Sequence, residues 1–215
     1  MIDSFKHKGL RKQLVQTIRE KGIKDERILE AIDKIPRHLF LDSSFLEFAY
    51  QDKPFPIGSG QTISQPYTVA FQTELLEVKA NEKILEIGTG SGYQACVLEE
   101  MGARVFSIER QKKLYLKYKK FLGSLGYKAK LFYGDGYKGL PAFAPFDKIL
   151  ITAGAPDLPE ALSEQLNTGG LIVVPIGKGG IQVMMRYIKM ADGSMKEEDH
   201  GSFRFVPMLR KMAND

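Results

Sequence analysis

Between residues 83 and 175, short apolar segments alternate with amphipathic ones, and this order constrains the fold more than any other feature. Apolar runs of this length predict strands, and apolar residues that recur every three or four positions predict helices. Strands alternating with helices at this pace are typical of an α/β fold with a doubly wound, mostly parallel sheet. The predicted strands are Lys83–Ile87, Arg104–Ile108, Ala129–Tyr133, Asp147–Thr152 and Leu171–Pro175, and the predicted helices are Tyr93–Met101, Gln111–Leu125 and Pro159–Leu166.

The segments that flank this core have a different character. Two added helices are predicted near the N-terminus, over Phe5–Lys21 and after Asp25, whose carboxylate can cap the second one. The proline- and glycine-rich stretch Pro54–Tyr67 is predicted to be a loop without a regular element. A helix over Thr68–Glu77 and two C-terminal antiparallel strands are also predicted, the strands at Gln182–Met190 and Phe203–Val206.

The first predicted core strand leads directly into the glycine loop Gly88-Thr89-Gly90-Ser91-Gly92. Glycines let the backbone turn tightly and approach a ligand closely. A dinucleotide fingerprint would need a third glycine at Tyr93, and the sequence contains no G-x-x-x-x-G-K-[ST] phosphate loop. Glu86, just before the loop, suits a cationic ligand better than a pyrophosphate. The spacing therefore favours S-adenosylmethionine, which carries a sulfonium and an ammonium group and no phosphate.

Two further acidic residues follow the next two predicted strands. Glu109 can accept hydrogen bonds from ribose hydroxyls, and Asp135 can accept one from an adenine amino group. Each has a structural alternative, since Glu109 could cap a helix and Asp135 could form an Asx turn. Acids at the ends of three successive strands together favour the cofactor site. The predicted cofactor-binding residues are Glu86, Gly88, Thr89, Gly90, Ser91, Gly92, Glu109, Arg110, Asp135 and Gly136.

Composition argues against several other classes of protein. One cysteine and three scattered histidines offer no metal-ligand spacing, so no metal site is predicted. The net charge is +5, but the basic residues around Lys112–Lys120 have the pattern of a solvated helix face, so no nucleic-acid partner is expected. No apolar run approaches the roughly 20 residues of a membrane helix. Without a signal-peptide pattern either, a cytoplasmic protein with no membrane partner is expected.

A carboxylate acceptor would fit this sparse set of titratable side chains. A carboxylate is already ionised at neutral pH, so methyl transfer to it needs no general base. The acceptor and the methyl carbon must be held about 3 Å apart and in line. We expect the acceptor near Pro54–Tyr67, where Thr62 and Ser64 can each donate a hydrogen bond. The residues alone leave open that both are turn residues.

Two longer segments resemble the protein-L-isoaspartate (D-aspartate) O-methyltransferase family, namely Gln61–Ala70 (QTISQPYTVA) and Leu85–Gln94 (LEIGTGSGYQ). The T-I-S-Q-P part is specific to this family, whereas many methyltransferases share the glycine loop. Shorter matches follow in order at Gly134–Gly136, Ala144–Asp147, Leu166–Gly170, Val174–Gly177 and Arg204–Pro207. The resemblance implies a class I, Rossmann-like S-adenosylmethionine methyltransferase that methylates the free α-carboxylate of L-isoaspartyl residues in damaged proteins. The ester then collapses to a succinimide, which begins repair.

The resemblance also implies roles for individual residues. Ser64 falls on the catalytic serine of the family, which orients the acceptor carboxylate by a hydrogen bond. Where the family often has V-P-L, this chain has Val206-Pro207-Met208, which puts substrate preference near that segment in question. The expected partners are isoaspartyl proteins and peptides, and the expected oligomeric state is a monomer. The predicted substrate-binding residues are Thr62, Ile63, Gln65, Pro66, Tyr67, Val206 and Pro207.

A single methyltransferase domain is expected over residues 1–215. Residues 1–78 would supply the N-terminal helices and the active-site loop, residues 79–180 the cofactor-binding core, and residues 181–215 the antiparallel strands and a substrate-covering segment. Two alternatives stay open, because a fold does not determine an acceptor. One is an S-adenosylmethionine-dependent methyltransferase for a small molecule or RNA, and the other is a module that binds the cofactor without chemistry.

Overall fold

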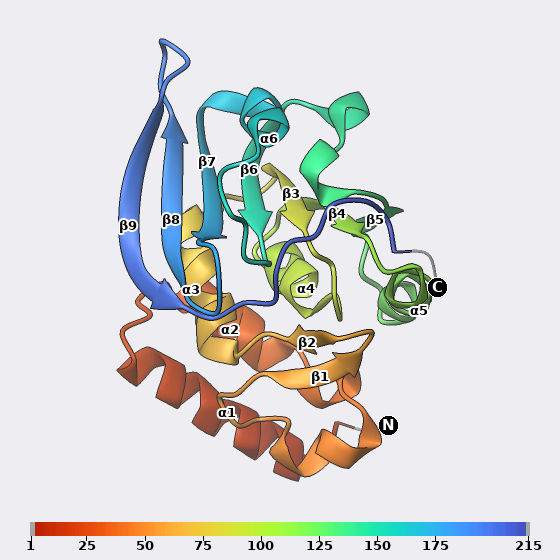
Figure 1. Cartoon of the computed structure of the whole chain (residues 1–215). Helices are drawn as coiled ribbons and strands as arrows, with labels where there is room; N and C mark the ends of the chain where they lie inside the picture. The colour runs from red at the N-terminus through yellow and green to blue at the C-terminus, as the bar shows by residue number, and fades with distance from the viewer. Residues whose placement is uncertain (1–2, 214–215) are drawn as a thin grey trace.

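The apolar segments of the core form a seven-stranded sheet, in the order β5-β4-β3-β6-β7-β8-β9 (Figure 1). The computed structural model describes residues 3–213. The first five core strands pair in parallel, and the last two join them in antiparallel pairs. The predicted mostly parallel sheet is therefore confirmed. The strands are β3 (Lys83–Ile87), β4 (Arg104–Glu109), β5 (Lys130–Tyr133), β6 (Phe146–Ile151), β7 (Leu166–Ile176), β8 (Gln182–Lys189) and β9 (Met195–Phe203).

Side chains that alternate along each core strand pack into two clusters, one on each face of the sheet. In β3, Ile84 packs with the cluster of the N-terminal helices, whereas Leu85 and Ile87 pack on the opposite face. Because both faces are covered, these strands can be apolar along nearly their whole length. The helices are α1 (Phe5–Glu20), α2 (Glu26–Lys34), α3 (Pro66–Leu76), α4 (Tyr93–Glu100), α5 (Lys112–Ser124) and α6 (Glu160–Glu164), with short 3₁₀ helices η1 (Arg37–Phe40), η2 (Ser43–Phe48), η3 (Gly136–Lys138) and η4 (Pro141–Phe143).

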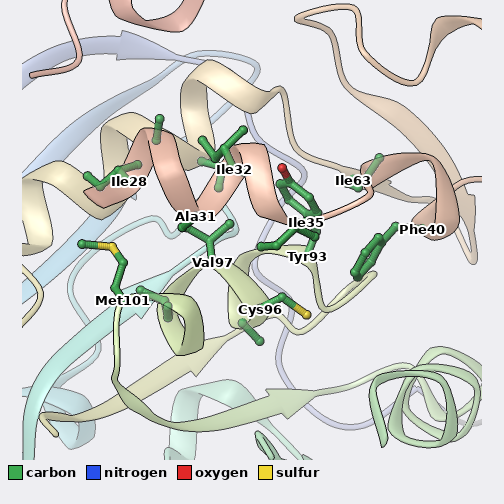
Figure 2. Packing of buried hydrophobic residues seen from close by; sticks show 14 of the residues in the cluster. Ile28, Ala31, Ile32, Ile35, Phe40, Ile63, Tyr93, Cys96, Val97 and Met101 are labelled. Carbon is green, nitrogen blue, oxygen red and sulfur yellow. The ribbon is translucent and has the colours of Figure 1, made fainter. Parts of the chain in front are cut away.

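The helix α2 packs across α4, which joins the N-terminal part of the chain to the core. Figure 2 shows Ala31 and Ile32 of α2 above Val97 of α4, all of them buried. The predicted cap of α2 is confirmed, because the Asp25 side chain accepts a hydrogen bond from the backbone N–H of Arg27. None of the helices within residues 3–213 is both long and apolar enough to cross a membrane.

The prediction of an irregular loop over Pro54–Tyr67 is wrong in part. A short antiparallel hairpin forms there from β1 (Phe55–Gly58) and β2 (Gln61–Ile63), and α3 begins two residues earlier than predicted. The apolar side chains of Phe55, Ile57 and Ile63 are buried, so burial of one face of the hairpin outweighs the local preference of its prolines and glycines. The turn itself has left-handed backbone at Ser59 and Gly60.

The predicted strand at Phe203–Val206 is also wrong. The last strand, β9, ends at Phe203, and residues 204–206 have no regular structure. The edge strand β9 is mostly polar, because it pairs on one side only and its side chains are largely exposed. Similarly, α6 ends at Glu164 and β7 begins at Leu166, so the predicted helix was too long and the predicted strand too short.

Beyond β9, residues 204–213 cross the ends of the parallel strands (Figure 1). The backbone of Gly154 bonds both Val206 and Met208, with N···O distances of 2.8 Å. Farther along, the backbone N–H of Ala213 donates to the carbonyl of Arg110 at 2.9 Å. These bonds hold the C-terminal segment over the edge of the sheet at which β3 and β4 end.

Candidate active site

A cavity of about 1170 Å³ lies between the hairpin, the ends of the parallel strands and the C-terminal segment. Ligands of open α/β sheets bind at this edge, where the strand order reverses. Pockets for one drug-sized ligand have roughly 300–1,000 Å³, so this cavity has room for a cofactor and part of a second ligand. The predicted site residues that line it are Thr62, Ile63, Ser64, Gln65, Tyr67, Gly88, Thr89, Gly90, Ser91, Glu109, Arg110, Gly136, Val206 and Pro207.

The glycine loop brings bare backbone to the wall of this cavity. Gly88 and Gly90 have φ angles of +101° and +53°, a region that favours glycine. A Cβ atom on Gly88 would lie 2.5 Å from the Thr152 hydroxyl oxygen. That hydroxyl donates to the carbonyls of Ile87 and Gly88, at 2.9 and 2.8 Å, so it cannot move freely. The backbone conformation and the close neighbour both require glycine at this position.

Glu109 lies at the end of β4 and lines the cavity, as the strand order predicts. Its two carboxylate oxygens accept hydrogen bonds from the backbone N–H groups of Gly90 and Gln111, at 2.9 and 2.8 Å. Burial raises the pKa of Glu109, and those backbone hydrogen bonds oppose the rise. The carboxylate thus ties the glycine loop to the end of β4 and keeps lone pairs available to a hydroxyl group in the cavity.

Glu86 does not line the cavity, although it was expected to face a cationic ligand. Its side chain is 0% exposed, within β3, and accepts a hydrogen bond from the Ser107 hydroxyl. Ser107 in turn shares a 2.6 Å hydrogen bond with the Thr89 hydroxyl of the glycine loop. Burial raises the pKa of Glu86 to about 8, and the nearby Glu109 adds to the rise. The Glu86 carboxyl is therefore neutral at pH 7. It supports the glycine loop through the hydrogen bonds that link it to Ser107 and Ser107 to Thr89.

Substitution of this carboxyl with an amide should remove a pH dependence of stability. In the folded chain Glu86 binds its proton up to about pH 8, whereas the ordinary value is 4.5. Between these values the unfolded chain carries fewer protons, so the free energy of unfolding should fall as pH rises, by about 1.4 kcal/mol per unit. Relative to wild type, Glu86→Gln should lack this slope in urea unfolding from pH 5.5 to 8. Parallel pH profiles for the two proteins would contradict it.

Asp135 also lies outside the lining of the cavity. One carboxylate oxygen accepts from the backbone N–H of Tyr137, and the other accepts from that of Lys211 at 2.9 Å. The structural alternative, an Asx-type cap, is thus realised, and the same carboxylate anchors the C-terminal segment. Two other predicted residues do not line the cavity either. Gly92 is the N-cap of α4, and Pro66 is the first residue of α3.

Ser64 stands between β2 and α3, with its half-buried side chain at the cavity. No residue within 3–213 bonds its hydroxyl, which leaves that group able to donate to a ligand. The next turn is held by Asp52, whose carboxylate accepts from the Tyr67 backbone N–H at 2.8 Å and the Gln65 amide at 2.9 Å. The start of α3, and with it the position of Ser64, is therefore fixed by groups outside the loop.

Several lining residues were not predicted from the sequence. Thr152 and Ala153 follow β6, the neighbour of β3 at which the strand order reverses, and that topology could have indicated them. Lys21 and His200 reach the cavity from α1's C-terminal cap and from β9, far away in the sequence. No local pattern distinguishes these two from ordinary surface residues.

Comparison with known proteins agrees with this geometry. Residues 9–213 match the model of a family described as protein-L-isoaspartate (D-aspartate) O-methyltransferase. The chain belongs to this family. A protein-L-isoaspartate O-methyltransferase from Cytophaga hutchinsonii is 58% identical over 211 residues, which cover 98% of this chain and 96% of the relative. The family resemblance inferred from the serine loop and the glycine loop is therefore confirmed.

Solved structures extend the comparison with the protein-L-isoaspartate O-methyltransferase family. One structure of a protein-L-isoaspartate O-methyltransferase has 30% sequence identity and a TM-score of 0.85, and the match covers 95% of this chain and 67% of that chain. A Plasmodium falciparum protein solved in complex with S-adenosyl-L-homocysteine has 24% identity and a TM-score of 0.80, over 93% of this chain and 98% of that one. The second likeness establishes a common fold.

Proposed function

We propose that this protein transfers a methyl group from S-adenosylmethionine to the free α-carboxylate of L-isoaspartyl residues in age-damaged proteins and peptides, which starts repair through a succinimide. The observation that carries the proposal is that one cavity is lined both by the glycine loop after β3 and by Ser64 of the T-I-S-Q-P segment. A protein that only bound the cofactor would not need the Ser64 segment at this cavity. A methyltransferase for isoaspartyl residues needs both the glycine loop and the Ser64 segment.

The lining of the cavity fits S-adenosylmethionine, with S-adenosyl-L-homocysteine as the product. Because Gly88 and Gly90 have no side chains, a ligand can approach their backbone closely. The Glu109 carboxylate can accept hydrogen bonds from hydroxyl groups of the ligand. When bound, the cofactor supplies a methyl group activated by a sulfonium. The residues proposed to hold it at the cavity wall are Gly88, Thr89, Gly90, Ser91, Glu109, Arg110 and Gly136.

On the acceptor side, Ser64 is proposed to orient the substrate carboxylate through its hydroxyl. No side chain has to remove a proton, because the acceptor carboxylate is ionised at neutral pH. The neighbouring residues Thr62, Gln65 and Tyr67 are proposed to contact the peptide, and Val206 and Pro207 to cover it and exclude water. This assigns the substrate to residues 1–78 and 181–215 and the cofactor to residues 79–180. A monomer in the cytoplasm is part of the same proposal.

A pair of peptides that differ only in one isoaspartyl or aspartyl linkage tests the acceptor. With tritiated S-adenosylmethionine, we expect base-labile label on the isoaspartyl peptide and none above background on its aspartyl twin. Equal labelling of the two peptides would contradict the proposal. Transfer to RNA or to a small acceptor, with no transfer to the isoaspartyl peptide, would favour the alternative methyltransferase activities.

A further inference from the structure

Arg37 is a fully buried arginine at the base of the hairpin. Its side chain is 0% exposed, at the start of η1. One guanidinium nitrogen, Nη2, donates to the backbone carbonyl of Ser64 at 2.8 Å and to that of Lys53 at 3.4 Å. Lys53 lies before β1, and Ser64 follows β2 directly. A single guanidinium therefore joins the two ends of the segment that carries the proposed catalytic serine.

The same guanidinium also lies close to the ring of Tyr93, with 4.9 Å between its carbon atom and the ring centroid. Tyr93 is the first residue of α4, directly after the glycine loop, and it lines the cavity. Figure 2 shows Tyr93 next to Ile35, two residues before Arg37, and near Phe40. Arg37 thus contacts the serine side and the cofactor side of the cavity at once.

A buried cation of this kind is costly for stability. No carboxylate within residues 3–213 forms an ion pair with Arg37, although the Asp52 carboxylate attracts it, and its Nε and Nη1 atoms have no hydrogen-bond partner there. Burial lowers the pKa of Arg37 to about 10, so the side chain still carries its charge at neutral pH. Well-packed apolar side chains are often as stabilising as buried charges. A requirement of the reaction would explain the arginine better than stability does.

We propose that Arg37 is a positioning residue that fixes Ser64 relative to the glycine loop during methyl transfer. The inference rests on the proposed function. A planar guanidinium can donate in its plane to carbonyl groups while its face stacks on an aromatic ring. A lysine ammonium can make one of these interactions, but it lacks the rigid fork that joins both. Through Arg37, the position of the acceptor group depends on the position of the cofactor loop.

Arg37→Lys keeps the charge and removes the fork. Because a displacement of about 1 Å can reduce a rate about 100-fold, we expect kcat for the isoaspartyl peptide to fall between about 10- and 100-fold. The KM for the peptide and the dissociation constant of S-adenosyl-L-homocysteine should each change less than about threefold. Arg11→Lys is the matched control, since Arg11 is also buried, at 5% exposure, but bonds Asp3 and Tyr50 instead of the hairpin. It should leave kcat unchanged.

A double-mutant cycle with Ser64→Ala separates positioning from a structural role. If Arg37 acts through the Ser64 hydroxyl, Arg37→Lys should reduce kcat less than about threefold in the Ser64→Ala background. Effects that multiply would overturn the proposal, as would equal losses of kcat and cofactor affinity. Wild-type protein that fails to methylate the isoaspartyl peptide would instead overturn the proposed function, before any variant is compared.

Thermal unfolding of each variant shows whether the chain folds. If Arg37→Lys does not fold, Arg37→Gln, which keeps an amide donor and removes the charge, is measured in the same cycle. We expect at least one of these proteins to fold with an unfolding midpoint close to that of Arg11→Lys. Failure of both to fold would assign Arg37 to global stability and overturn the positioning role.

Discussion

Ser64→Ala is expected to lower kcat for an isoaspartyl peptide by about 100-fold or more, since removal of one preorganised hydrogen-bond donor from an active site typically costs that much. The hydroxyl lies at the cavity and is bonded by no described residue, so its role is toward a ligand. Within residues 3–213, no hydrogen bond joins the glycine loop to this hydroxyl. The dissociation constant of S-adenosyl-L-homocysteine should therefore change less than about threefold.

Single-turnover methyl transfer and calorimetric titration with S-adenosyl-L-homocysteine measure these two quantities separately. Ser43→Ala is a suitable control, because Ser43 is an exposed serine on η2 outside the cavity. It should match wild type in both measurements. A large loss of cofactor affinity in Ser64→Ala with unchanged turnover would refute the orienting role, because it would place the hydroxyl on the cofactor side.

The central sheet could be predicted from sequence because both of its faces are buried. Strands β3 to β6 are short runs of apolar residues, and their predicted bounds lie within one residue of the observed ones. The edge strand β9 has no such run, since its pairing is made by backbone groups that every sequence carries. The hairpin failed for the opposite reason, because tertiary burial of Phe55, Ile57 and Ile63 outweighed the local turn signals.

Most of the residues predicted for the site line one cavity, but the sequence could not tell which way each carboxyl group points. Glu86 lies inside β3, so its side chain is directed onto one face of the sheet, where it meets Ser107 of β4. Glu109 ends its strand, and its side chain reaches the cavity. Asp135 follows β5, but its carboxylate is taken by backbone groups, one of them 76 residues away in sequence. Such long-range partners leave no local pattern.

The same limit applies to Arg37. Its partners lie 16 and 27 residues farther along the chain, and a third contact is Tyr93. In the sequence it stands next to His38 in a short segment after a helix, where an arginine ordinarily faces solvent. Its burial becomes evident only when the hairpin is folded back on η1. Buried residues that support an active-site loop through partners distant in sequence are therefore difficult to predict from the sequence alone.

Gly88→Ala is expected to weaken binding of S-adenosyl-L-homocysteine by about 100-fold or more, because it disturbs the glycine loop in two ways. A φ of +101° is unfavourable for a residue with a side chain, by roughly 1–2 kcal/mol for left-handed backbone. The new Cβ would also lie 2.5 Å from the Thr152 hydroxyl oxygen. Relief requires that the loop move or that the hydroxyl give up its bonds to two backbone carbonyls. Either change displaces the backbone that faces the cavity.

Gly134→Ala provides the matched control for this substitution. A Cβ on Gly134 would lie at an ordinary contact distance, 3.5 Å from a methyl group of Ile108, and its φ is not in the left-handed region. Its cofactor affinity should stay within about threefold of wild type. Thr152→Ala added to Gly88→Ala should recover part of the affinity, since it removes the steric conflict and leaves the backbone strain. If Gly88→Ala binds S-adenosyl-L-homocysteine as tightly as Gly134→Ala does, the loop does not form the wall against which the cofactor binds.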